Sequence, residues 1–107
     1  MIQAAVHGAE GRMGKLVTEL VSVAEDVDLA GLVTEPGRQF EVGEFHPLLP
    51  LVGQDRMAQS LPAGCVIVDF SLAPALDGLL DQARWLGSPL VVGTTGFDAA
   101  QQARLEE

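Results

Sequence analysis

The sequence is poor in cysteine, in positive charge and in long apolar runs, and each shortage excludes a class of protein. Its one cysteine, Cys65, excludes an intramolecular disulfide and a Cys-x-x-Cys metal motif, and we expect no metal site. The 107 residues include 6 basic and 15 acidic side chains, which gives a formal net charge of −9. Such a surface repels nucleic acid and anionic membranes, so we expect neither as a partner.

The sequence also lacks segments for export or membrane insertion. Its N-terminus has no basic region, and the apolar run at residues 2–6 is too short for a signal peptide. No run reaches the length of a transmembrane helix. These absences favour a reducing, cytoplasmic setting.

Glycines recur at every third position near the N-terminus, at Gly8, Gly11 and Gly14, between an apolar run and an amphipathic segment. Gly8 would let the chain turn sharply, and Gly11 would let the backbone approach a ligand because no Cβ stands in the way. Gly14 would let the following helix pack closely on the preceding strand. The pattern has one residue more between its first two glycines than the G-x-G-x-x-G fingerprint of dinucleotide-binding proteins.

The same turn predicts an anion site at the start of a helix. The backbone N–H groups of Gly11, Arg12 and Met13 would have no helical acceptors, because a helix leaves its first donors free. Together with the positive end of the helix dipole, they would suit a pyrophosphate. The alternative interpretation is a tight turn with only a structural role.

Apolar runs and amphipathic segments alternate along the chain, as in proteins built from strand–helix–strand units with parallel strands. The expected strands cover residues 2–7, 28–33, 49–52, 65–70 and 90–92, and the expected helices cover residues 12–24, 55–60, 74–86 and 99–107. We therefore expect one α/β domain over residues 1–107, with a doubly wound parallel sheet between two helical layers. Because that fold usually has about six strands, we expect this to be the front part of a longer protein.

Apolar spacing predicts how the helices and the long loop pack. In the first helix, the expected buried stripe consists of Met13, Leu16, Val17, Leu20, Val21 and Ala24. We expect Trp85 to pack between helix and sheet rather than to stack on a ligand. The loop between residues 34 and 64 is expected to pack on the domain through Phe40, Phe45, Leu48 and Leu49.

Polar residues follow two of the expected strands. Asp69 ends the strand at 65–70, where we expect it to accept hydrogen bonds from the next loop rather than to act on a ligand. A turn rich in glycine and hydroxyl groups, from Gly93 to Asp98, follows the strand at 90–92. Because parallel strands end at one edge of the sheet, this turn is either a capping turn or a second wall of a ligand crevice. His46 is interpreted as a solvated loop residue.

Three of these stretches resemble the dihydrodipicolinate reductase family. The first runs from Val6 to Gly14, with the sequence VHGAEGRMG; the second is VDFS at residues 68–71, followed by Pro74; the third is VVGTTGFD at residues 91–98. Their order and approximate spacing agree with the family, and the resemblance spans nearly the whole chain.

The resemblance implies a Rossmann-type NAD(P)H-binding domain at the N-terminus of a two-domain reductase of lysine and diaminopimelate biosynthesis. The pyrophosphate would be held by Gly8, Ala9, Glu10, Gly11, Arg12 and Met13. Phe70 would border the nicotinamide, beside Gly93, Thr94 and Thr95. The family's ribose-binding position reads Thr34-Glu35 here. A carboxylate accepts from ribose hydroxyls and repels a 2′-phosphate, so NADH is expected to be preferred or well tolerated unless Arg12 or Arg38 reverses this.

The resemblance also implies what lies outside this sequence. In the family, the catalytic histidine-rich motif, a lysine and the tetramer contacts belong to the substrate domain, so we expect no catalytic residue here and cofactor binding without turnover. One alternative is a non-catalytic nucleotide-binding or interaction module on the same fold. Another is a dehydrogenase of the aspartate or homoserine type, which would not be expected to carry the stretch from Gly93 to Asp98.

Overall fold

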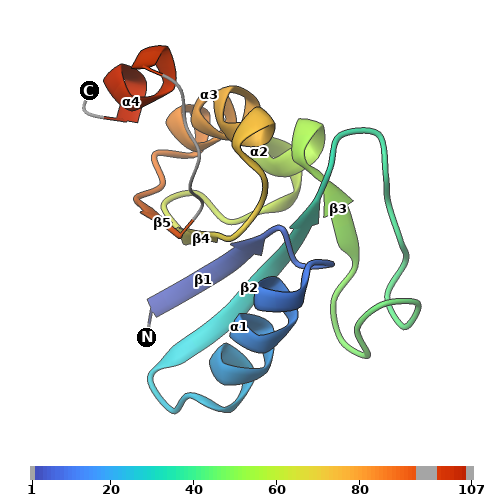
Figure 1. Cartoon of the computed structure of the whole chain (residues 1–107). Helices are drawn as coiled ribbons and strands as arrows, with labels where there is room; N and C mark the ends of the chain where they lie inside the picture. The colour runs from blue at the N-terminus through green and yellow to red at the C-terminus, as the bar shows by residue number, and fades with distance from the viewer. Residues whose placement is uncertain (1, 94–98, 106–107) are drawn as a thin grey trace.

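A computed structural model describes residues 2–93 and 99–105 of the chain. Its core is a five-stranded, all-parallel sheet with the strand order β3-β2-β1-β4-β5 (Figure 1). The strands are β1 (Ile2–His7), β2 (Val27–Thr34), β3 (Leu51–Gly53), β4 (Val66–Asp69) and β5 (Leu90–Val92). The helices are α1 (Arg12–Val23), α2 (Met57–Ser60), α3 (Leu76–Leu86) and α4 (Ala99–Leu105), with 3-10 turns η1 (Gln54–Arg56) and η2 (Ala73–Ala75).

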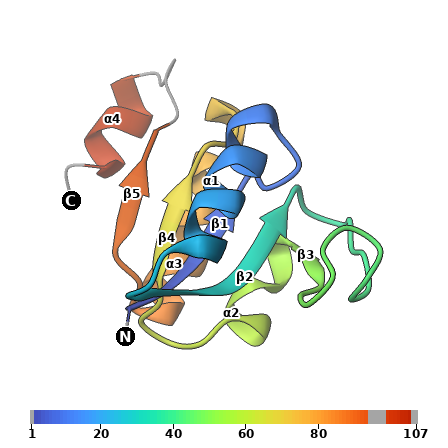
Figure 2. The same cartoon turned by 90° about the horizontal axis from the view of Figure 1, so that it is seen from below.

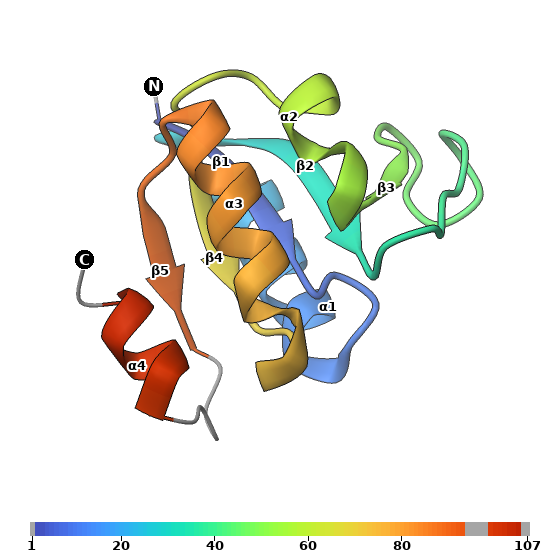
Figure 3. The ribbon, with the colours of Figure 1, turned by 90° about the horizontal axis from the view of Figure 1, so that it is seen from above.

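Helices cover both faces of the sheet. Helix α1 lies on one face, and α2 and α3 lie on the other, as the views from below and above show (Figures 2 and 3). Helix α4 lies beside α3, to which its Arg104 is joined by ion pairs with Asp77 and Asp81. The predicted doubly wound α/β fold is therefore confirmed. Within the described ranges, no helix has the length and apolar character needed to cross a membrane.

Two apolar clusters fill the spaces between the layers. Ala5, Val33 and Ile67 face α2 and α3, where they meet residues such as Leu79. Val6, Leu32 and Leu51 face the opposite side, where Val17 of α1 packs against them. Successive strand residues point to opposite faces, so β1 and β2 contribute to both clusters and are apolar at most positions.

The apolar stripe predicted for α1 is wrong at four of its six positions: Met13, Leu16, Leu20 and Ala24 are exposed, and Val17 and Val21 are half-buried. Leu16 and Leu20 are 49% and 68% exposed, and Met13 is also exposed. The buried residues of α1 are Gly14 and Thr18, whose small size brings the helix close to β1. Because these two residues occupy the centre of the contact, the larger apolar side chains are rotated toward its edge.

The prediction that Trp85 packs between helix and sheet is also wrong, because its side chain is 71% exposed. Helix α3 buries Leu76, Leu79, Ala83 and Leu86 at helical spacing, and Trp85 lies off that face. The expected end of the helix is confirmed at Gly87, which adopts the left-handed conformation with φ of 65°.

The long loop contains the expected short strand and helix. Strand β3 begins two residues later than predicted and pairs with β2 from Leu32 to Thr34. An antiparallel bridge joins Phe40 to Leu51. Phe40, Phe45 and Leu49 pack on the cluster beneath α1, as expected. Leu48 is 78% exposed, so its predicted packing is wrong.

Candidate functional site

A cleft of about 640 Å³ opens at the carboxyl ends of β1, β2 and β4. The strand order reverses between β1 and β4, and ligands of doubly wound sheets bind outside the strand ends at such a switch point. The volume lies within the range of small-molecule and cofactor pockets. Four groups of residues form the cleft: the turn after β1, the end of β2, the loop from β4 to η2, and the side chains of His7 and Gln54 between them.

The turn after β1 is held by backbone hydrogen bonds. Gly8 has a φ of +82°, which residues with a Cβ rarely adopt. The N–H groups of Gly8 and Ala9 both donate to the carbonyl of Val33, at 2.9 and 3.1 Å. The N–H of Gly11 donates to the carbonyl of Gly8 at 3.1 Å, so the expectation that this donor is free is wrong. The turn closes on itself instead of leaving that donor for a ligand.

The start of α1 faces the cleft with an open backbone. Gly11 is the N-cap residue and provides no side-chain cap, so the first-turn N–H groups of Arg12 and Met13 keep the orientation of free helical donors. A Cβ on Gly11 would lie 3.4 Å from its nearest neighbour, the Gly8 carbonyl oxygen. A Cβ on Gly14 would lie 2.0 Å from the same oxygen. Gly14 is therefore required for helix packing, whereas Gly11 is required only if something approaches from the cleft.

The β2 end of the cleft is formed by Glu10, Thr34, Glu35 and Arg38, of which three are charged. The Thr34 hydroxyl donates to the Glu10 carboxylate. Nη1 of Arg38 lies 3.1 Å from Glu10 Oε1 and 3.4 Å from Glu35 Oε1. The Arg38 guanidinium also stacks over the Phe40 ring, 5.2 Å from its centroid. Two carboxylates therefore share one guanidinium here.

An aromatic ring marks the β4 end of the cleft, which consists of Phe70, Ser71, Leu72, Pro74 and Ala75. The Phe70 N–H donates to the His7 carbonyl at 3.1 Å, and the Gly93 N–H donates to the Asp69 carbonyl at 2.8 Å. A Cβ on Gly93 would lie 2.3 Å from Cε1 of Phe70, so the ring packs directly on this glycine. The structure thus brings together two residues that the sequence placed far apart.

A buried polar network lies between the two ends of the cleft. His7 is 2% exposed, and its Nδ1 lies 2.9 Å from Oδ1 of Asp69. Its Nε2 lies 3.0 Å from Nε2 of Gln54. Oδ1 of Asp69 also accepts from the backbone N–H and the hydroxyl of Ser71, at 3.0 and 2.6 Å, so its predicted role as an acceptor for the loop is confirmed.

Two opposing effects act on the Asp69 carboxyl. Burial alone would raise its pKa, but the hydrogen bonds from His7 and Ser71 outweigh burial and hold the pKa below its ordinary value of 3.8. Asp69 is therefore ionised at neutral pH. Neither His7 nor Gln54 was predicted from the sequence to belong to this network. One usable signal was that His7 and Asp69 each end a strand of the switch-point pair, where they are register partners.

The residues predicted to bind a cofactor are only partly gathered in the cleft. Those that line it are Gly8, Glu10, Gly11, Thr34, Glu35 and Phe70. Ala9 is fully buried in the apolar cluster beneath α1. The side chains of Arg12 and Met13 are exposed outside the cleft lining. Gly93 packs against Phe70 but is outside the cleft lining, and Thr94 and Thr95 lie outside the described residues.

The parallel sheet, its glycine turn and the cleft at its switch point define a Rossmann-type α/β domain. The family described as "Dihydrodipicolinate reductase, N-terminus" matches residues 2–107, and the chain belongs to this family.

Relatives and a solved structure agree with this assignment. The 4-hydroxy-tetrahydrodipicolinate reductase of Alkalilimnicola ehrlichii is 38% identical over 95% of this chain, and that of Sulfurimonas denitrificans is 35% identical over 100% of it. The chain spans 40% of the length of each relative. The dipicolinate-bound dihydrodipicolinate reductase of Paenisporosarcina sp. TG-14 superposes with a TM-score of 0.68, at 19% identity, over 97% of this chain and 41% of that one. At that identity, the last comparison supports the fold alone.

Proposed function

We propose that this chain is the cofactor-binding part of a 4-hydroxy-tetrahydrodipicolinate reductase and that its cleft binds NAD(P)H. The observation that carries the proposal is the open start of α1 at Gly11, which faces a cleft at the switch point of the sheet. A helix N-terminus with unpaired donors is suited to a pyrophosphate. Membership of the reductase family supports the same ligand.

Each part of the cleft has a role in this proposal. Gly8 and Gly11 let the backbone approach the pyrophosphate, and the N–H groups of Arg12 and Met13 donate to it. Phe70 and Gly93 border the nicotinamide. When bound, NAD(P)H supplies a hydride; the residues of this chain bind and orient the cofactor. We also propose that Thr94 and Thr95 contribute beside the nicotinamide.

The activity of the whole protein is part of the proposal, because the chain spans 40% of the length of its relatives. We propose that the whole reductase transfers a hydride to the dihydrodipicolinate precursor in lysine and diaminopimelate biosynthesis, as a cytoplasmic homotetramer. Its substrate site and tetramer contacts would lie outside this sequence. This chain alone would then bind the cofactor without turnover.

The β2 end of the cleft supports a preference for NADH. Glu10 and Glu35 contribute two negative charges there, and Arg38 contributes one positive charge. Carboxylates accept hydrogen bonds from a ribose diol, whereas a 2′-phosphate would bring further negative charge to a site that is already negative. NADH should therefore bind at least as tightly as NADPH.

Titration of the chain with NADH and NADPH, followed by calorimetry or nucleotide fluorescence, tests this function. Gly11→Val should weaken binding at least about tenfold, because its branched side chain would fill the approach to the pyrophosphate. The variant should still fold, since the Cβ at this position meets only one atom, at 3.4 Å. Leu48→Val, in an exposed loop position, is the matched control. Unchanged binding in Gly11→Val contradicts the proposed site, and absence of binding in the unmodified chain contradicts the function.

A further inference from the structure

We propose that His7 is a positioning residue for the nicotinamide half of the dinucleotide. Through Asp69 and Gln54, its imidazole holds both the loop after β4 and the 3-10 turn η2, which together form the β4 end of the cleft. The inference rests on the proposed dinucleotide binding. It assigns a role to a largely buried side chain in the lining of the cleft.

The two ring nitrogens of His7 have different roles. The side-chain Nε2 of Gln54 is a donor, so Nε2 of His7 must accept from it over 3.0 Å. The proton of the neutral ring then lies on Nδ1, which donates to Asp69 Oδ1 over 2.9 Å. One buried ring therefore connects a carboxylate on β4 with an amide on η1. Asp69 is the charged group within hydrogen-bond distance of the ring among the described residues.

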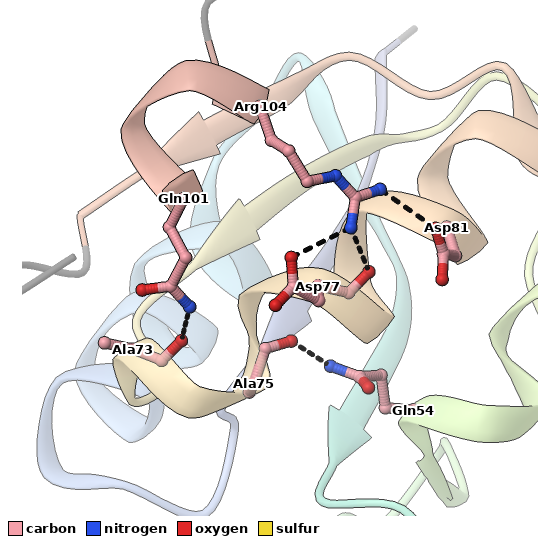
Figure 4. Close-up of polar contacts among 7 residues, drawn as sticks. All are labelled: Gln54, Ala73, Ala75, Asp77, Asp81, Gln101 and Arg104. Carbon is pink, nitrogen blue, oxygen red and sulfur yellow. Dashed lines mark hydrogen bonds and ion pairs between the residues drawn. The ribbon is translucent and has the colours of Figure 1, made fainter. Parts of the chain in front are cut away.

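The network ends on the backbone of the cleft wall. Asp69 accepts from the N–H of Ser71, which fixes the chain immediately after Phe70. Gln54 donates from the same nitrogen to the carbonyl of Ala75, at 2.8 Å (Figure 4). Ser71 and Ala75 both line the cleft. A displacement of the His7 ring would therefore move both Ser71 and Ala75 at the β4 end of the cleft.

The η2 turn is held at its other end as well. Gln101 of α4 donates to the carbonyl of Ala73 at 2.7 Å (Figure 4). The side chains of Gln54 and Gln101 therefore both donate hydrogen bonds to carbonyls of η2. The amide of Gln54 occupies the space next to Gly78, because its Oε1 lies 2.1 Å from where a Cβ on Gly78 would be. Even a single methyl group on α3 should therefore push Gln54 away from His7 and Ala75.

The network is separate from the other end of the cleft. Thr34, Glu35 and Arg38 form their side-chain contacts with Glu10, Phe40 and one another. In folds of this type, the end of the second strand contacts the adenosine ribose. Disturbing His7 should therefore weaken contacts to the nicotinamide half and leave contacts to the adenosine half in place.

The test compares NADH with ADP-ribose, which keeps the adenosine and the pyrophosphate but lacks the nicotinamide. Calorimetric titrations would use the unmodified chain, His7→Leu and His7→Gln. Leucine removes both hydrogen bonds, and we expect about tenfold weaker NADH binding with ADP-ribose affinity changed less than about twofold. The glutamine amide offers one donor and one acceptor, so His7→Gln should restore most of the NADH affinity.

A second variant reaches the network from α3. Gly78→Ala keeps His7 and should weaken NADH binding about threefold, because its methyl group displaces the Gln54 amide. If His7→Leu does not fold, the comparison of NADH with ADP-ribose is made with Gly78→Ala and His7→Gln. Equal weakening of both ligands, or unchanged NADH binding in the variants that fold, overturns the positioning role. If the unmodified chain binds neither ligand, the proposed function itself fails.

Discussion

The two ends of the cleft use polar groups in opposite ways. At the β2 end, the charged side chains are exposed or half-buried: Glu35 is 67% exposed, Arg38 44% and Glu10 28%. At the β4 end, the polar groups are buried, with His7 at 2% and Asp69 at 1%. The first set can reorganise around a ligand, whereas each member of the second set has a fixed partner.

This difference indicates that the β2 end selects which cofactor binds and that the β4 end holds the cofactor in position. Exposed charges contribute little to folding, because water and salt screen them, but they discriminate between ligands of different charge. Buried hydrogen bonds cost stability when broken, because a stranded polar group has no water to replace its partner. We therefore expect substitutions at the β2 end to alter cofactor choice, and substitutions at the β4 end to alter folding and geometry.

The largest expected effect is on stability, at Asp69. Asp69→Asn keeps the shape of the side chain but removes the charge that His7 and Ser71 stabilise. We expect the free energy of unfolding at neutral pH to fall by about 2 kcal/mol, since hydrogen bonds to charged groups contribute that order. Urea titrations of both proteins would measure the difference.

The pH dependence gives this prediction a definite sign. The pKa of Asp69 is lowered in the folded state, so its contribution is present above the ordinary value of 3.8 and is lost as the pH falls below it. The difference between the two proteins should therefore shrink in acid. A difference that stays constant from neutral to strongly acid pH would show that the charge contributes nothing.

A smaller effect, on ligand choice, is expected at Glu35. Glu35→Arg replaces a carboxylate with a guanidinium that pairs with a 2′-phosphate, and it should shift the ratio of NADPH to NADH affinity about tenfold toward NADPH. Titrations with both nucleotides measure the ratio. Glu19→Arg, on the exposed side of α1, changes net charge equally and should leave the ratio unchanged. Tighter binding of NADPH than of NADH by the unmodified chain would contradict the placement of Glu35 at the ribose.

The smallest effect is expected for the stability of Arg38→Gln. The variant loses ion pairs with Glu10 and Glu35. Because Arg38 itself is exposed and Glu10 is only half-buried, the free energy of unfolding should change by less than about 1 kcal/mol. Added salt should reduce this small difference and leave the Asp69 difference nearly intact. If Arg38→Gln destabilised the chain as much as Asp69→Asn, the contrast between the two ends would fail.

The fold was largely predictable from local patterns. Strands such as β1 and β4 are short apolar runs bounded by turn residues, and Gly87 ends α3 as its position suggested. The packing of α1 was not predictable from periodicity. An apolar stripe gives the direction of a helix face, but the small Gly14 and Thr18 determine where the helix approaches the sheet. Trp85 shows the same limit, because its apolar character did not reveal which side of α3 it occupies.

The candidate site was also predictable from the sequence only in part. The glycine turn and Phe70 were found because a motif names each residue in order along the chain. The network of His7, Gln54 and Asp69 combines residues from three segments, separated by as many as 62 positions. It becomes visible only when β1 and β4 are known to be neighbours in register. A sequence motif records local order, whereas this network depends on strand pairing.

The pairing of His7 with Asp69 also has a consequence for how the sequence can change over time. Replacing either residue alone strands its buried polar partner, and replacing both with apolar residues would also remove an acceptor from Gln54 and from Ser71. Positions 7 and 69 are therefore coupled to positions 54 and 71, and single apolar substitutions at any of them disturb the same set of hydrogen bonds. A library that varies these four positions jointly would sample compensating combinations that single-site libraries do not contain.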